Sequence, residues 1–285
     1  MRGVETPKGI EPDFRRPASR LPPREDVRRR IRPYPIYWGE APEPLLIAKD
    51  WLRHHALALG AHTGESGPAI RLWRATLGAR LLSDIRQAGL LFVHIPKTAG
   101  TSISGLLYGR NLTHFTLAQY ERRLGTAIGE VVSFSVVRQP IERFVSAFGF
   151  HRAGGTDVVL ADRYERARIP HLDDIERLID FLHEDPRRVA CASAFLPQVG
   201  FLQTASGGLG ADALFAMDGR AQEPLGLSAW LGRGPLPRLN VSERSPITLG
   251  VASKRKLAEL YQGDFDLFET ALAQSLARVA GRPPR

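Results

Sequence analysis

A lysine lies among hydroxyl-bearing and small residues in the string His94-Ile95-Pro96-Lys97-Thr98-Ala99-Gly100-Thr101-Ser102. Lys97 supplies a mobile positive charge, and the hydroxyls around it supply hydrogen-bond donors. Gly100 lets the backbone approach a ligand without an intervening Cβ. A loop that turns into a helix at this point adds backbone N–H groups and the positive end of the helix dipole. These residue types in this order predict a phosphate-binding loop.

The string differs from the two common nucleotide-binding loops. The chain has no Gly-Lys dipeptide, so G-x-x-x-x-G-K-[ST] is absent, and the string is not G-x-G-x-x-G either. Lysine is also scarce, since five lysines stand against 34 arginines, and a lysine in the folded body is therefore unusual for this chain. The alternative interpretation is a helix capped by a Ser or Thr side chain, with Lys97 as an incidental residue.

A second string that could bind an anion is Val136-Val137-Arg138-Gln139-Pro140-Ile141-Glu142-Arg143-Phe144-Val145-Ser146. Arg138 follows a predicted strand, and open parallel sheets bind ligands at the carboxyl ends of their strands. Ser146 lies about two turns into the helix that follows. A guanidinium and a hydroxyl that converge suit a second phosphate. We expect Glu142 and Arg143 to face solvent or to pair locally.

Two strand–loop–helix units position these strings. Apolar and β-branched runs predict strands at 90–95 and 131–137, each followed by a loop and a helix, and Pro140 suits the first position of the second helix. Repeated units of this kind indicate βαβ architecture with a parallel sheet. Further helices are predicted at 45–59, 69–88, 173–183 and 253–279, and a short strand at 214–217.

Composition limits the class of protein. The 285 residues suit one large domain or two small ones, and 43% hydrophobic with 24% charged residues is typical of a globular chain. Cys191 is the single cysteine, which excludes an intrachain disulfide and a cysteine-based zinc site. There is no apolar run of membrane-spanning length and no secretory signal pattern at the start of the sequence. We therefore expect a cytoplasmic protein.

Positive charge is concentrated at the start of the sequence. The net charge is +9, and residues 1–33 hold ten basic and five acidic residues, which is more than half of the excess. Residues 1–44 also hold nine of the 21 prolines, so we predict a flexible, disordered tail there. Because the remaining body carries only a small excess, its charge does not indicate a nucleic-acid partner.

The two strings resemble the nucleotide-binding motifs of one enzyme family. LLFVHIPKTAGTSI resembles the 5′-phosphosulfate-binding loop of sulfotransferases, most closely in the carbohydrate branch with the heparan sulfate 2-O- and chondroitin sulfotransferases. SFSVVRQPIERFVSAF resembles the 3′-phosphate-binding motif of that family, with Gln139 and Ile141 in place of the usual Asn and aromatic residue. Segments 196–202, 236–242 and 260–265 resemble later landmarks more weakly, so the resemblance spans about 90–270.

The resemblance implies a fold and a donor. The fold is a three-layer, P-loop-NTPase-like α/β domain with a central parallel sheet, which we assign to residues 45–285. The donor is 3′-phosphoadenosine-5′-phosphosulfate (PAPS), the acceptor is a carbohydrate or small-molecule hydroxyl or amine, and no metal is implied. Carried over, the residues that hold the 5′-phosphosulfate are Lys97, Thr98, Ala99, Gly100, Thr101 and Ser102. Arg138 and Ser146 hold the 3′-phosphate, and Lys97 stabilises the charge on the leaving phosphate.

An acceptor hydroxyl needs a general base. His114 is the best-placed candidate, because family members often carry a His-x-Thr segment there and an imidazole titrates near neutral pH. The alternative is that His114 is a packing or surface histidine, with Glu121 or Glu130 as the base. We expect His94 to lie in the core.

Two other functions are compatible with the same residues. One is a P-loop-like nucleotide-dependent kinase or phosphotransferase, which metal dependence and ATP binding would distinguish. The other is a non-enzymatic anion-binding module that uses the basic tail. Residues 151–212 are the predicted acceptor wall. Its arginines, Arg152, Arg163, Arg166 and Arg168, either meet an anionic sugar or form a solvated helix face.

Overall fold

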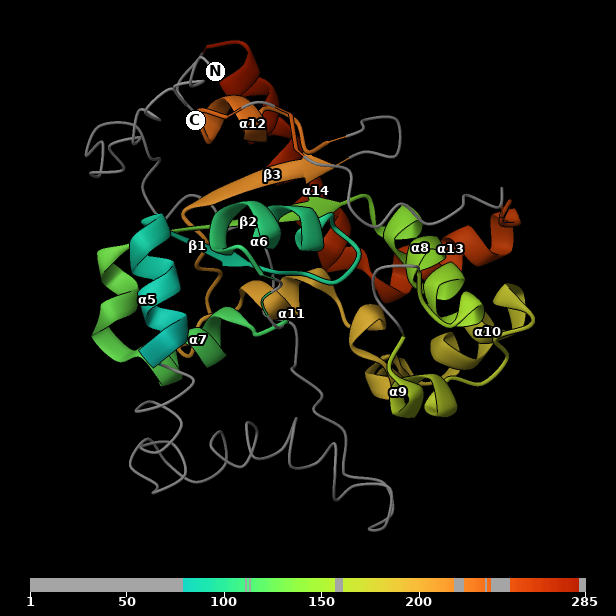
Figure 1. Cartoon of the computed structure of the whole chain (residues 1–285). Helices are drawn as coiled ribbons and strands as arrows, with labels where there is room; N and C mark the ends of the chain where they lie inside the picture. The colour runs from blue at the N-terminus through green and yellow to red at the C-terminus, as the bar shows by residue number, and fades with distance from the viewer. Residues whose placement is uncertain are drawn as a thin grey trace, which may run out of the picture.

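The computed structural model describes residues 79–110, 112, 114–156, 161–217, 223–233, 235–236 and 247–281. The predicted tail over 1–44, the helix at 45–59 and most of segment 236–242 lie outside these residues. Within the described ranges, three strands form one parallel sheet in the order β1-β2-β3: β1 is Leu90–Val93, β2 is Val132–Arg138 and β3 is Ala213–Met217 (Figure 1). The expected α/β class with a parallel sheet is confirmed.

The register places both anion-binding strings at one edge of this sheet. Val93 of β1 pairs with Ser135 of β2, and Arg138 pairs with Met217 of β3. Helix α6 (Gly100–Tyr108) follows β1, and helix α8 (Pro140–Ala153) follows β2. Because parallel strands end at the same edge, the two loops between strand and helix lie side by side.

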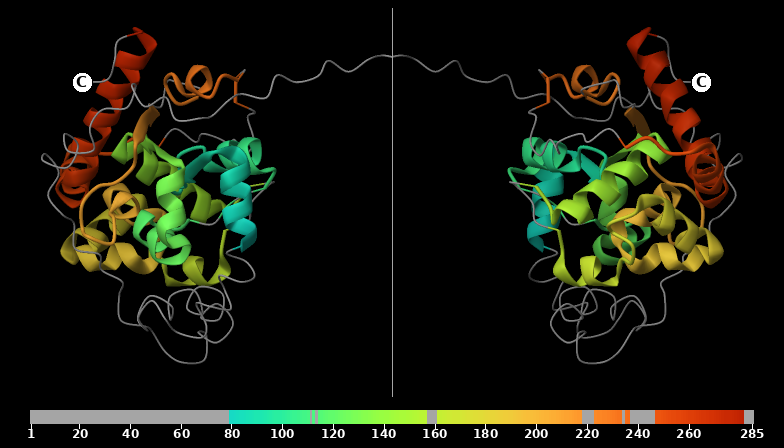
Figure 2. Two further views of the ribbon diagram at one scale, coloured as in Figure 1. Left: turned by 90° about the vertical axis from the view of Figure 1, so that its left-hand side faces the viewer. Right: turned by 90° about the vertical axis from the view of Figure 1, so that its right-hand side faces the viewer.

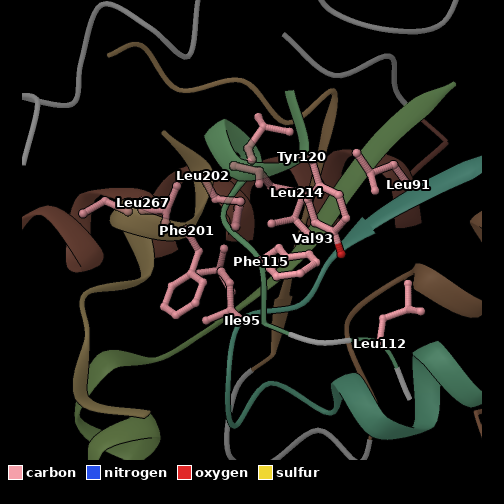
Figure 3. Packing of buried hydrophobic residues seen from close by; sticks show 14 of the residues in the cluster. Leu91, Val93, Ile95, Leu112, Phe115, Tyr120, Phe201, Leu202, Leu214 and Leu267 are labelled. Carbon is pink, nitrogen blue, oxygen red and sulfur yellow. The ribbon is translucent and has the colours of Figure 1, made fainter. Parts of the chain in front are cut away.

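Helices cover both faces of the sheet. Leu91, Val93 and Leu214 pack against α5 (Ala79–Ala88), α7 (Leu117–Leu124), α11 (Gln198–Leu202) and α14 (Gln262–Val279), as Figure 3 shows for part of this cluster. Phe92 and Phe134 point to the other face, where they pack with residues of α6 and α12 (Leu227–Trp230). The alternation along β1 and β2 therefore separates two apolar layers.

A third apolar cluster lies beside the sheet. It joins α8 to α10 (Ile175–Glu184), α13 (Val251–Leu260) and the 3₁₀ turns η4 (Pro186–Cys191) and η5 (Ser193–Phe195), near the short helix α9 (Arg163–Arg168) (Figure 1). A further 3₁₀ turn, η3 (Gly125–Glu130), precedes β2. None of the helices in the described ranges is long and apolar enough to cross a membrane.

The prediction of one long helix over 253–279 is wrong. The chain forms two helices, α13 and α14, because Tyr261 leaves the helical conformation with φ −116° and ψ 29°. Its ring is buried in the third cluster, and its hydroxyl donates a hydrogen bond of 2.7 Å to Phe195 O. The apolar periodicity continues across this break, so periodicity alone does not locate it. In the side views, α14 lies across the molecule from α5 (Figure 2).

A tyrosine hydroxyl closes the free edge of β1. Tyr108 Oη accepts a hydrogen bond of 2.8 Å from Phe92 N–H and donates one of 3.0 Å to Leu90 O. The hydroxyl therefore satisfies two strand groups that face no other strand in the described part of the chain. Burial, as the largest cause, raises the pKa of Tyr108, so the proton stays on the hydroxyl.

Side chains of α14 close the free edge of β3 in the same way. Gln274 Oε1 accepts from Leu214 N–H at 3.3 Å, and Ser275 Oγ accepts from Ala216 N–H at 2.9 Å. Arg278 Nη1 donates to Leu214 O at 2.6 Å. Both edges of this small sheet are thus protected from pairing with another chain.

Tyr108→Phe should lower the free energy of unfolding by about 1–3 kcal/mol, because it leaves two strand groups without a partner. Urea unfolding measures this difference. Tyr120→Phe is the matched control, since the Tyr120 hydroxyl is buried and has no hydrogen-bond partner in the described part of the chain. Its removal should cost less than about 0.5 kcal/mol. Equal losses in both variants would contradict the edge role of Tyr108.

Candidate functional site

The loop between β1 and α6 has an unusual backbone conformation. Lys97 and Ala99 lie in the left-handed region, with φ 70° and φ 63°, although neither is glycine. Each such residue costs on the order of 1–2 kcal/mol, and strain of this kind concentrates at functional sites. Left-handed residues that alternate with others turn successive N–H groups to one side and form an anion-binding concavity.

The backbone N–H groups of this loop have no acceptor in the described part of the chain, since those of residues 97–101 donate no hydrogen bond there. Ala99 is the N-cap of α6 and provides no side-chain cap, which corrects the alternative interpretation of a Ser or Thr cap. Thr98 Oγ1 donates to Ile95 O at 2.8 Å, so this hydroxyl holds the loop shape. Five N–H groups at a helix N-terminus therefore form a site for an anion.

The ammonium group of Lys97 lies on an aromatic ring of α8. Its Nζ is 4.1 Å from the centroid of Phe150. Burial, followed by the charge of Arg138, lowers the pKa of Lys97 to about 8. The lysine is thus mainly protonated at neutral pH, and it loses this charge within a mildly basic range.

Arg138 joins the two strings directly. Its Nη1 donates to Lys97 O at 3.3 Å, and its Nε lies 3.8 Å from Glu142 Oε2. The Arg138 side chain is 16% exposed, so it is fixed against the loop and still reaches the surface. The local pairing expected for Glu142 is confirmed.

One face of α8 runs along the loop. Glu142, Ser146 and Phe150 are spaced by four residues, so they share a helix face. Glu142 contacts Arg138, and Phe150 contacts Lys97. Ser146 lies between these two contacts and is half-buried. The helix spacing therefore places Ser146 on the side of α8 that faces Lys97 and Arg138.

Arg143 does not face solvent or pair locally, which corrects that expectation. Its side chain is 2% exposed, and its Nη2 lies 3.9 Å from Asp264 Oδ2 of α14. Its Nη1 donates to Ala194 O at 2.9 Å, and Nη2 donates to Leu196 O. Arg143 lies on the face of α8 that packs into the third cluster, so it connects elements that are distant in sequence.

Gln198 fixes the end of β2, a role that the sequence did not reveal. This side chain is fully buried, its Oε1 accepts from Arg138 N–H at 3.0 Å, and its Nε2 donates to Arg138 O at 2.8 Å. Asp264 in turn accepts from Gln198 N–H at 2.8 Å and from Val199 N–H at 3.0 Å. Segment 196–202, which resembles an acceptor-side landmark, therefore supports the backbone of Arg138.

Gly100 leaves space for a neighbouring side chain. A Cβ at this position would lie 1.8 Å from His94 Cδ2, so the His94 ring occupies the space that the glycine leaves. The close approach of a ligand to the Gly100 backbone stays a prediction. His94 is buried, as expected.

The three candidate bases lie in different places. His114 is exposed, and its ring centroid is 4.2 Å from that of His94. Glu121 Oε2 accepts from Ala205 N–H at 2.6 Å. Glu130 pairs with Arg86 at 2.9 Å. Glu130 also precedes β2, and the length of that strand, about 20 Å, separates it from Arg138 at the other end. Glu130 is therefore excluded as a base for this site. His114 is the candidate whose ring contacts His94, and the His94 ring in turn lies against Gly100 of the loop.

The arginines of the predicted acceptor wall make ordinary surface contacts. Arg166 Nε donates to His151 O at 2.9 Å, and Arg168 Nη2 donates to Ala190 O at 3.4 Å. Arg152 and Arg163 are exposed. In the described ranges, no group of three His, Cys, Asp or Glu side chains is placed to hold a metal ion.

Comparison with known proteins points to one family. The sequence model of the sulfotransferase family matches residues 84–164. This range includes both strings, β1, β2, α6 and α8, together with His114. The match supports a sulfotransferase family and a transferase activity in general. No curated protein and no solved structure matches the chain.

Gln198→Glu should lower the free energy of unfolding by about 1–3 kcal/mol at neutral pH, because an oxygen replaces the Nε2 donor and faces Arg138 O. Part of this loss should be recovered on acidification, since a protonated carboxyl donates again and the folded variant binds that proton more tightly than the unfolded chain. Denaturant unfolding between pH 5 and pH 8 measures both effects. Gln262→Glu, at an exposed position of α14, is the control and should show neither.

Proposed function

We propose that this protein is a sulfotransferase that moves a sulfuryl group from PAPS to a hydroxyl of a carbohydrate or another small-molecule acceptor. The observation that carries the proposal is the row of five backbone N–H groups that have no acceptor among the described residues, next to Lys97 and Arg138. The family match over residues 84–164 supports it. The proposal includes a P-loop-NTPase-like arrangement for the domain at 45–285.

The hydrogen-bond donors of this site suit a nucleotide with two anionic ends. The residues proposed to hold the 5′-phosphosulfate are Lys97, Thr98, Ala99, Gly100, Thr101 and Ser102. In this loop the backbone N–H groups contribute more than the hydroxyls, because Thr98 Oγ1 already donates to Ile95 O. Arg138 and Ser146 are proposed to hold the 3′-phosphate, with the guanidinium giving planar, charge-assisted contacts.

Lys97 and His114 have separate proposed roles in transfer. PAPS supplies the sulfuryl group and a phosphate as the leaving group. Lys97 and the loop N–H groups stabilise the negative charge that grows on the bridging oxygen, an effect commonly worth 10²–10³ in rate for one donor. His114 takes the proton of the acceptor hydroxyl, and its exposed position leaves room for an acceptor beside the loop.

Calorimetry with 3′-phosphoadenosine-5′-phosphate and with ATP tests the proposal against a kinase. We expect the bisphosphate to bind at least tenfold more tightly than ATP with Mg²⁺, and Arg138→Ala to remove most of that preference. Arg233→Ala, at an exposed position, is the charge-matched control and should leave binding unchanged. Tighter binding of ATP with Mg²⁺, unaffected by Arg138→Ala, would favour the phosphotransferase alternative.

Transfer itself should depend on the same two residues. Lys97→Ala and Arg138→Ala should each reduce turnover with PAPS by at least 10²-fold while the circular dichroism spectrum is retained. Wild-type turnover in both variants would contradict the proposal. Binding to acidic polymer that survives Lys97→Ala and disappears on deletion of residues 1–33 would instead favour the anion-binding module.

Affinity for 3′-phosphoadenosine-5′-phosphate should decline above about pH 8. The pKa of Lys97 in the free protein is about 8, and the bound anion favours the protonated lysine. Each pH unit above this value should therefore weaken binding by up to tenfold, while the ligand phosphates are already fully ionised. In Lys97→Arg the charge persists, so its affinity should stay level between pH 7.5 and 9.5. Parallel declines in both proteins would contradict this role of Lys97.

A further inference from the structure

His94 lies between His114 and the loop of residues 97–101. It follows β1 directly, is 3% exposed, and stacks on Phe92 with ring centroids 5.6 Å apart. On its other side the ring fills the space above Gly100, where a Cβ would lie 1.9 Å from His94 Nε2. The position of this ring is therefore fixed from two sides.

The hydrogen bond of His94 determines its tautomer. Nδ1 lies 3.3 Å from Leu112 O, and a carbonyl oxygen can only accept, so Nδ1 carries the proton. Burial, followed by the charges of His114 and Lys97, lowers the pKa of His94 well below its usual value. The ring is thus a neutral donor to Leu112 O across the pH range in which a sulfotransferase would work.

Leu112 and Thr116, on either side of His114, are each held by hydrogen bonds. Leu112 is 3% exposed and is held by His94. Thr116 caps α7 through a capping box with Gln119, with hydrogen bonds of 2.9 and 3.2 Å. His114 lies between these anchors, is exposed, and meets the His94 ring edge-on at 4.2 Å with an interplanar angle of 67°.

We infer that His94 is a positioning residue for His114, because its hydrogen bond to Leu112 O and its contact with the His114 ring hold these two residues against the loop of residues 97–101. The inference rests on the proposed function, in which His114 is the general base. A base works only within hydrogen-bond reach of the proton it takes, and a displacement of about 1 Å can cost on the order of 10²-fold in rate. His94 itself is buried, so it acts through His114.

His94→Asn and His94→Leu form a nearly isosteric pair that tests this inference. Asn retains an N–H donor close to the position of Nδ1, whereas Leu removes the donor, and both leave the same space. With PAPS as donor, we expect His94→Leu to lower kcat by on the order of ten- to hundredfold. The dissociation constant of 3′-phosphoadenosine-5′-phosphate should stay within about twofold, and His94→Asn should recover most of kcat.

The double variant His94→Leu/His114→Ala shows whether His94 acts through His114. It should turn over no more slowly than His114→Ala alone, since the residue to be positioned is already gone. A further loss equal to that of His94→Leu alone would overturn the inference, as would equal kcat values for the Asn and Leu variants. Wild-type kcat in His114→Ala would also overturn it, while leaving the sulfotransferase proposal in place.

Amide hydrogen exchange gives a readout that needs no substrate. Exchange at residues 114–116 should be at least tenfold faster in His94→Leu than in wild type, and close to wild type in His94→Asn. Unchanged exchange in His94→Leu would overturn the inference even if transfer occurs. Faster exchange in a protein that does not bind 3′-phosphoadenosine-5′-phosphate would support the anchor and refute the sulfotransferase proposal, so the two failures are distinguishable.

Discussion

The left-handed backbone of Lys97 and Ala99 is the constraint on which the candidate site depends. Two residues with a Cβ adopt this conformation, and five successive N–H groups, those of residues 97–101, are left without an acceptor in the described part of the chain. Both features cost free energy in the folded state, and an anion that binds these N–H groups offsets part of it. The strained loop, the cation of Lys97 and the guanidinium of Arg138 therefore form a single electrostatic unit, which the family match over residues 84–164 associates with sulfotransferases.

Buried polar contacts from distant parts of the sequence hold this unit in place. Gln198 pairs with both backbone groups of Arg138, and Asp264 of α14 binds the N-terminus of α11 while it lies beside the buried Arg143. The same helix α14 closes the edge of β3 through Gln274 and Ser275. The C-terminal part of the chain thus stabilises both the sheet and the strand end that carries Arg138. His94 makes a comparable buried contact, since its Nδ1 donates to Leu112 O.

Local sequence patterns predicted the elements that carry the site. The strands, the loop after β1 and the helix that begins at Pro140 follow from apolar runs, turn residues and proline, all of which act over a few residues. Patterns of this range could not reveal that Arg143 pairs with Asp264, that Gln198 holds Arg138, or that Tyr261 ends a helix, because each depends on a partner far along the chain. The sequence predicted that Gly100 leaves the backbone open to a ligand. Only the folded chain shows that the His94 ring occupies the space where a Cβ would lie.

The most direct test of this account is a crystal structure of the protein with 3′-phosphoadenosine-5′-phosphate. The account predicts that oxygens of the 5′-phosphate accept hydrogen bonds from the N–H groups of residues 97–101, with Lys97 turned from Phe150 toward them and Arg138 on the 3′-phosphate. A nucleotide bound elsewhere, with these N–H groups still lacking an acceptor, would contradict the central claim.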